Sequence, residues 1–152
     1  MIKISLIFSL VCTLLFGLNV PKVGDSVLPV TLKTQFDKVE KITNDTEIIL
    51  YFPDKTAYKI VEAFFKTQNK EYLALKKAVL IADVSAAPSF VISMFIKPNL
   101  RDLGHKVFVI DDDMSPVIFP SHLEEISVVR LREGKIVSMA YCKTLESFKE
   151  KF

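Results

Sequence analysis

The sequence has few of the residues on which small zinc, redox and nucleotide-binding domains depend. Its 152 residues include two cysteines, two histidines, four glycines and no tryptophan. Two cysteines are too few for a disulfide-stapled miniprotein or a cysteine-rich zinc site. The four glycines are scattered, so there is no glycine-rich phosphate loop and no dinucleotide-binding fingerprint. A G-x-S-x-G nucleophile elbow and paired histidine ligand spacings are also missing.

The chain also lacks a strong charge of either sign. Its net charge is +2, with 25% charged residues, and this balance gives no reason to expect nucleic acid as a partner. Half of the residues are apolar and 12 are phenylalanine, which excludes a disordered chain. The length suits one domain with a substantial buried core.

The first 19 residues differ in character from the rest. After Lys3, residues 4–18 run ISLIFSLVCTLLFGL without a charge, which is typical of a secretory signal. We expect residues 1–19 to be a signal peptide or an uncleaved N-terminal membrane anchor, because the run is short for a full span. A buried N-terminal helix and lipidation at Cys12 are the alternatives, although bulky Val11 fits a lipobox poorly. Residues 20–152 then form the domain.

Beyond residue 20, strand-like and helix-like segments alternate. The apolar runs EIILYF, AVLIADV and KVFVI predict buried strands, and Glu133-Gly134 joins two strands in a hairpin. The predicted strands are 27–32 (an edge strand because of Pro29), 36–42, 47–52, 78–84, 106–110, 117–119, 126–132 and 135–140. The predicted helices begin at Asp54 or Thr56, near Pro88, and at Thr144.

This order predicts an α/β sandwich with a mixed central sheet flanked by helices. Pro98 should end or kink the second helix. Helical spacing assigns several large apolar side chains to the core, and we expect His105 and His122 at the surface. The expected core residues of the first two helices include Phe64, Phe65, Phe90, Val91, Met94 and Phe95.

The order of elements is similar to that of the thioredoxin-like fold. The closing segment ISVVRLREGKIVSMAYCKTLESFKEKF resembles the last hairpin and helix of thioredoxins. The segments GDSVLPV, DKTAYK, ADVSAAPSFVISMFIKPNL and FVIDDD resemble the uncharacterised exported YtfJ-like family. The resemblance spans most of residues 23–150 and implies a thioredoxin-like domain.

The sequence departs from that resemblance at the redox site. Thioredoxins open their first helix with Cys-x-x-Cys, whereas residues 52–59 here read FPDKTAYK. The proline that precedes the penultimate strand in thioredoxins is replaced by Glu125. The fold therefore does not bring disulfide exchange with it, and one cysteine past residue 19 cannot form an internal disulfide.

Three groups of residues are candidates for chemistry. Cys142 is either a working monothiol or an inert thiol at a strand end. Asp54, Lys55 and Thr56 lie where thioredoxin-like folds place their active site, and they could bind an anion or simply cap the helix. The turn Asp111-Asp112-Asp113 offers oxygens to a hard cation, although it does not have EF-hand spacing and acidic turns are common.

We therefore expect an exported, cysteine-less thioredoxin-like accessory or binding module of the bacterial cell envelope, without disulfide exchange. The alternative is an oxidoreductase acting through Cys142 or through an undetected flavin or peroxide site. No cofactor is indicated. The expected partner is an envelope protein or a small ligand, with membrane attachment through residues 4–18 if that segment is retained.

Overall fold

The computed structural model describes residues 20–111 and 118–152. Its centre is a seven-stranded mixed sheet in the order β2-β1-β5-β4-β3-β6-β7. The strands are β1 (Val30–Thr34), β2 (Val39–Ile42), β3 (Ile48–Phe52), β4 (Ala78–Asp83), β5 (Val107–Ile110), β6 (Ile126–Arg132) and β7 (Lys135–Cys142). The helices are α1 (Lys55–Phe65), α2 (Tyr72–Leu75), α3 (Ser89–Val91), the π-helical turn η1 (Ile92–Ile96), α4 (Lys97–Asp102) and α5 (Leu145–Lys151).

The three buried runs form the middle of the sheet, as predicted. β3 and β4 are parallel, as are β4 and β5, and every residue of β3 and β5 is buried. Apolar side chains on both faces of these strands need cover on both sides of the sheet. The α/β class with a mixed sheet is therefore confirmed.

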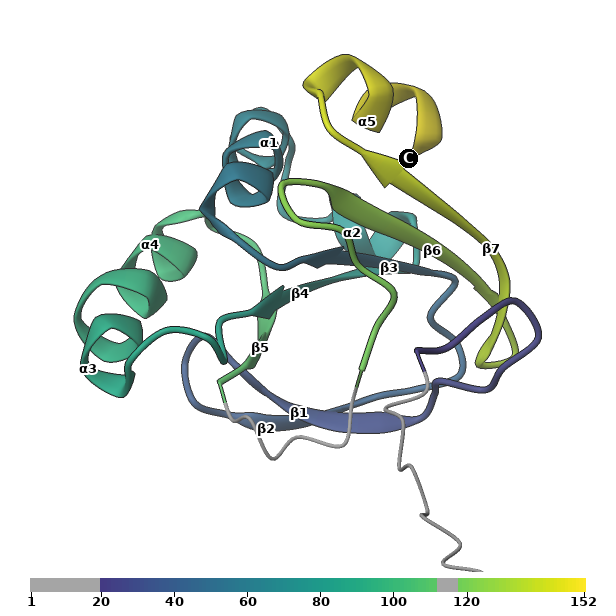
Figure 1. Ribbon diagram of the computed structural model, residues 1–152, viewed down its shortest axis with the longest axis horizontal. Helices are drawn as coiled ribbons and strands as arrows, with labels where there is room; N and C mark the ends of the chain where they lie inside the picture. The colour runs from purple at the N-terminus through teal and green to yellow at the C-terminus, as the bar shows by residue number, and fades with distance from the viewer. Residues whose placement is uncertain (1–19, 112–117) are drawn as a thin grey trace, which may run out of the picture.

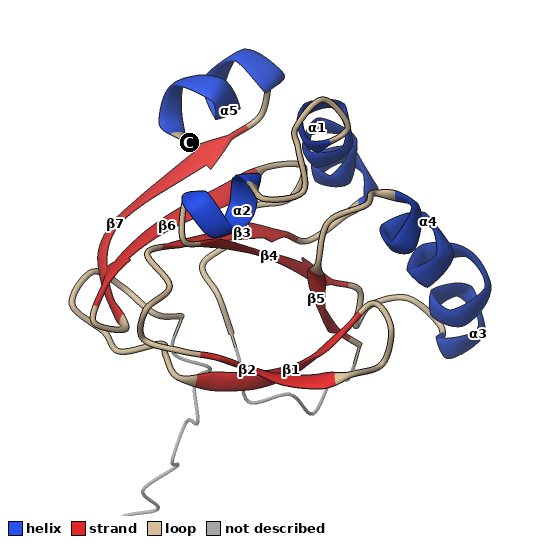
Figure 2. Cartoon of the chain, turned by 180° about the vertical axis from the view of Figure 1, so that it is seen from behind, coloured by secondary structure: helices blue, strands red, loops and turns tan. Residues whose placement is uncertain are grey.

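Two packed layers supply that cover (Figures 1 and 2). On one face, α1, α2, α4 and α5 enclose a core that includes Phe65, Leu80 and Phe148. On the other face, the curved β1–β2 hairpin encloses a second core around Ile49 and Phe108. The two faces of β3 alternate between these cores, as the period of a strand requires.

The closing hairpin and helix form for local reasons. Glu133 and Gly134 have φ of +52° and +80°, which is the geometry of a two-residue hairpin turn. A Cβ at Gly134 would lie 2.6 Å from Asn44 Oδ1 and 2.9 Å from Leu28 O, so only glycine fits. Thr144 and Ser147 then form a reciprocal capping box at the start of α5.

The predicted edge position of the first strand is wrong. β1 pairs with both β2 and β5, and β2 is the edge strand. Pro29 lies just before β1, where its missing N–H costs no ladder bond. The predicted strand at 117–119 is not seen at Ile118 or Phe119, while residue 117 lies outside the described residues.

The second predicted helix differs from expectation in shape and orientation. α3 continues through η1 into α4, so Pro98 lies in the first turn of α4 and does not end the helix. The π-helical turn, which contains Met94 and Phe95, shifts the register of the side chains. Met94 and Phe95 are 67% and 58% exposed, and Phe90, in α3 before the turn, is 64% exposed, so none of the three is a core residue.

The prediction that His105 lies at the surface is also wrong. It is buried, with its Nε2 donating to the Phe65 carbonyl at 3.0 Å. Gln35 is buried nearby, donates to the His105 carbonyl at 2.7 Å and accepts from the Val107 N–H at 2.9 Å. His122 is exposed, as expected, and stacks on Tyr141.

The helices within residues 20–111 and 118–152 are all too short or too polar to cross a membrane. The predicted signal or anchor at residues 1–19 lies outside the described residues and stays a prediction.

Candidate functional site

The N-terminus of α1 is capped by a side-chain carboxylate. Asp54 is the N-cap: its Oδ1 accepts from the Ala57 N–H at 2.9 Å, the standard bond of an N-cap aspartate. Its Oδ2 accepts from the Glu124 N–H at 2.6 Å. The loop before β6 is thereby fixed over the helix start, and both oxygens of Asp54 are used internally.

Beside this helix start lies a pocket of about 550 Å³, within the range of small-molecule sites, about 300–1,000 Å³. It is formed where β3 and β4 end, between α1 and the α3–η1–α4 helix. This position, at the carboxyl ends of parallel strands, is where α/β sheets commonly bind ligands. Its apolar lining comprises Phe52, Pro53, Tyr58, Ala82, Val84, Ala86, Ala87, Val91, Phe95, Ile96 and Leu100.

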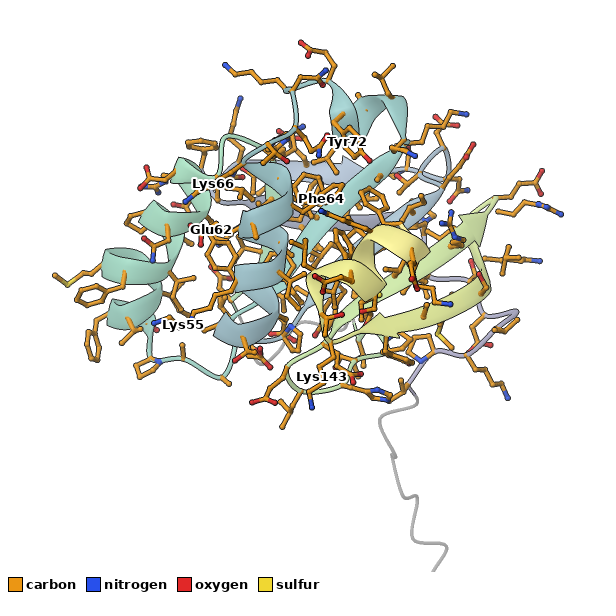
Figure 3. All side chains as sticks on the ribbon, turned by 90° about the horizontal axis from the view of Figure 1, so that it is seen from above. Lys55, Glu62, Phe64, Lys66, Tyr72 and Lys143 are labelled. Carbon is orange, nitrogen blue, oxygen red and sulfur yellow. The ribbon has the colours of Figure 1, made fainter. Side chains whose placement is uncertain are left out.

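The polar side chains of the pocket come largely from one wall. Asp54, Lys55, Lys59 and Glu62 lie on or before α1, and Asn99 lies opposite. Figure 3 shows Lys55 and Glu62 on the side of α1 that faces α3 and α4, whereas Phe64 points away into the core. A ligand here would therefore meet charge on one wall and apolar surface on the other.

Asp83 lies in the pocket wall with its carboxylate already engaged. Oδ2 accepts from the Tyr51 hydroxyl at 2.5 Å, and Oδ1 accepts from the Ser85 hydroxyl at 2.6 Å. Burial, with the bond to Asp83 adding to it, raises the pKa of Tyr51. Tyr51 therefore stays protonated and donates to Asp83. The hydrogen bonds among Tyr51, Asp83 and Ser85 stabilise the end of β4.

Tyr58, on α1, links the two walls of the pocket through a hydrogen bond to Asn99 on α4. Its hydroxyl donates to the Asn99 carbonyl at 3.1 Å. Burial raises the pKa of Tyr58 to about 12, with the charges of Glu62 and Asp102 adding to the effect. The hydroxyl therefore remains a donor at neutral pH, and the α1–α4 contact that shapes the pocket is maintained.

Of the residues predicted at this site, Asp54 and Lys55 line the pocket, whereas Thr56 is exposed and does not. The carboxylate of Asp54 already occupies part of the helix N-terminus, which leaves less of it for an outside anion. Asp83, Tyr58, Val91 and Phe95 were missed as site residues. Tyr58 lies on α1 with Lys55, whereas Asp83, Val91 and Phe95 come from segments that approach α1 only in the folded chain, so no local sequence signal marks those three.

Cys142 lies away from this pocket, at the end of β7. Its side chain is buried, and Sγ donates to the Ser147 carbonyl at 3.6 Å. Burial raises the pKa of the Cys142 thiol, so the reactive thiolate is disfavoured at neutral pH. Within residues 20–111 and 118–152 it is the sole cysteine, and no disulfide-forming pair exists there.

The acidic turn is only partly described. Asp111 Oδ2 accepts from Lys97 Nζ at 3.2 Å, and Lys97 also donates to Asp37 at 2.5 Å. Asp112 and Asp113 lie outside the described residues, so the predicted cation site stays a prediction. Elsewhere in the described chain, no group of three or more histidine, cysteine or acidic side chains could hold a metal ion.

Comparisons with solved structures identify the fold. A thioredoxin domain of a thiol-disulfide oxidoreductase from Bacteroides vulgatus matches with a TM-score of 0.51 and 15% identity, covering 86% of this chain and 97% of that one. A Chlorobium tepidum protein provisionally named as the thiol:disulfide interchange protein DsbE matches with a TM-score of 0.54 and 11% identity, covering 86% of this chain and 95% of that one. Peroxidoxin BcpB from Mycobacterium tuberculosis matches with a TM-score of 0.52 and 10% identity, covering 86% of this chain and 93% of that one.

At these identities the likeness shows the fold alone. The chain therefore has a thioredoxin-like fold, as its sequence resemblance implied. No protein-family model matches the sequence, and no curated protein matches it.

Proposed function

We propose that this chain is an exported thioredoxin-like binding module of the bacterial cell envelope, which holds a small ligand with an apolar body and carries out no disulfide exchange. The observation that carries the proposal is the pocket of about 550 Å³ beside α1, lined mainly by apolar side chains and without a cysteine. Largely apolar concave sites with a few polar groups are typical of small-molecule binding.

Export and kinship are further parts of this proposal. Export is supported by the charge-free run at residues 4–18, and mass spectrometry of the mature N-terminus tests whether that run is removed. Kinship with the exported YtfJ-like family is supported by the segments GDSVLPV and DKTAYK. The second of these includes the start of α1, at the pocket.

Binding is tested with the fluorescent apolar probe N-phenyl-1-naphthylamine on the full chain. Ala87 lines the pocket, so Ala87→Trp should fill it and weaken probe binding at least about tenfold. Ala74 is exposed on α2, outside the pocket, so Ala74→Trp is the matched control and should bind as wild type. Circular dichroism checks that both variants fold. Equal binding by folded Ala87→Trp overturns the pocket as the site.

The absence of exchange is tested by insulin reduction, together with an absorbance scan of the purified protein. We expect no turnover, because no cysteine lies at the start of α1 and Cys142 is buried. Turnover, or a bound chromophore, would favour the oxidoreductase alternative and contradict the proposal.

A further inference from the structure

The charges that line the pocket are not equally available to a ligand. The three acidic residues all have partners: Asp54 accepts from two backbone N–H groups, Asp83 from two hydroxyls, and Glu62 pairs with Lys66 at 2.7 Å. Lys55 and Lys59 are exposed on the same wall. Among the residues that the structure describes, neither lysine has an ion-pair partner.

Lys55 and Lys59 are spaced i, i+4 on α1, so they project from the same face of the helix. Figure 3 shows Lys55 reaching into the space between α1 and α3. Two adjacent cations with no internal partner attract an anionic group at the pocket mouth. The neighbouring carboxylate of Asp54 opposes this attraction little, because its charge is already balanced by backbone N–H groups and the helix N-terminus.

The opposite wall has a different character. The stretch 84–96, VSAAPSFVISMFI, has no charged residue. Val91, Phe95 and Ile96 line the pocket, and Phe90 and Met94 of the same stretch are exposed outside its lining. Large exposed apolar side chains indicate a surface that is covered when a partner binds. This wall suits a long apolar chain.

We propose that the ligand is a single-chain anionic amphiphile of the fatty-acid class. Its carboxylate lies between Lys55 and Lys59, and its alkyl chain packs against Val91, Phe95 and Ile96. This inference rests on the proposed binding function and adds the charge and shape of the ligand. Because the lysines are exposed, they contribute mainly discrimination of charge, while the apolar wall contributes most of the affinity.

The test compares two single-chain probes of similar length and opposite charge on the full protein, by titration calorimetry below their micelle concentrations. Laurate should bind about tenfold or more tightly than dodecyltrimethylammonium, because the lysines attract one head group and repel the other. Raising the salt concentration should reduce this preference. Equal affinities, or tighter binding of the cationic probe, would overturn the inference.

The double variant Lys55→Gln/Lys59→Gln should abolish the preference, because it removes both cations from the pocket lining. Lys143→Gln/Lys149→Gln is the matched control: both lysines are exposed and outside the pocket lining, Lys143 just before α5 and Lys149 within it. Figure 3 shows Lys143 beside α5. If the neutral probe binds in the pocket but laurate shows no preference, only this inference fails. If neither binds there, the proposed function fails as well. Binding to phosphatidylglycerol vesicles without binding of monomeric laurate would also overturn the inference, in favour of a membrane surface.

Discussion

The start of α1 and the end of β7 each lack one of the features that thiol chemistry requires. The start of α1 has an open pocket but no thiol, and its N-cap is the carboxylate of Asp54. The end of β7 has the thiol of Cys142, which does not line the pocket beside α1 and is buried with a raised pKa. Thiol chemistry needs an accessible thiolate beside a substrate site. The site beside α1 has no thiol and the thiol of Cys142 is not accessible, so neither region meets both requirements.

The largest expected effect concerns the reactivity of Cys142. Its alkylation by iodoacetamide, followed by peptide mass spectrometry, should be at least about 1,000-fold slower in the native protein than in guanidinium chloride. The reason is that a buried thiol reacts only when the structure opens. Native and denatured rates within tenfold of each other would show an accessible thiol and would remove the contrast between the two regions.

A smaller effect is expected at the start of α1. Asp54→Ala removes the acceptor for both the Ala57 and Glu124 N–H groups, and we expect a loss of about 2 kcal/mol in the free energy of unfolding. Thr144→Ala, which removes the cap of α5, is the control and should cost about 1 kcal/mol. Denaturant titration measures both. A smaller loss for Asp54→Ala than for Thr144→Ala would show that the Glu124 contact contributes nothing.

The pH dependence of stability should distinguish the buried thiol from an exposed one. Because burial raises the folded-state pKa of Cys142 above its ordinary value of 9.0, its contribution is complete below pH 9 and is lost as the pH rises further. Wild type should therefore lose stability more steeply than Cys142→Ala above pH 9, by at most about 1.4 kcal/mol per pH unit. Parallel curves for the two proteins would contradict burial of the thiol.

The smallest expected effect is at the pocket lysines. Lys55→Gln/Lys59→Gln should change the free energy of unfolding by no more than about 0.5 kcal/mol, because both side chains are exposed and have no ion-pair partner among the described residues. Thermal and denaturant unfolding measure this. A loss above 1 kcal/mol would assign these lysines a structural role and not one in ligand recognition.

The sequence predicted the framework of the fold because its signals are local. The buried strands, the 126–140 hairpin and the Asp54 and Thr144 caps each depend on a short run of residues. The exposure of Phe90, Met94 and Phe95 could not be predicted in this way. Their stretch lacks charges that would mark an outer face, and the π-helical turn changes the helical period on which the prediction relied.

The candidate site was predictable only in position. Resemblance to the thioredoxin-like fold directed attention to Asp54 and Lys55, which do line the pocket. The opposite wall comes from residues 82–100, some 30 to 40 positions later in the chain, and its approach to α1 depends on the packing of the whole domain. The burial of His105 likewise depends on distant partners, since its ring donates to the Phe65 carbonyl.

The most direct measurement of the central claim is a ¹⁵N–¹H NMR titration of the full chain with N-phenyl-1-naphthylamine. If the site beside α1 is a ligand pocket, the amide shifts of Lys55, Tyr58, Val91 and Phe95 should change together and saturate with a single dissociation constant, while Cys142 remains unaffected. Shifts confined to the surroundings of Cys142, or the absence of saturable shifts at α1 and η1, would contradict the claim.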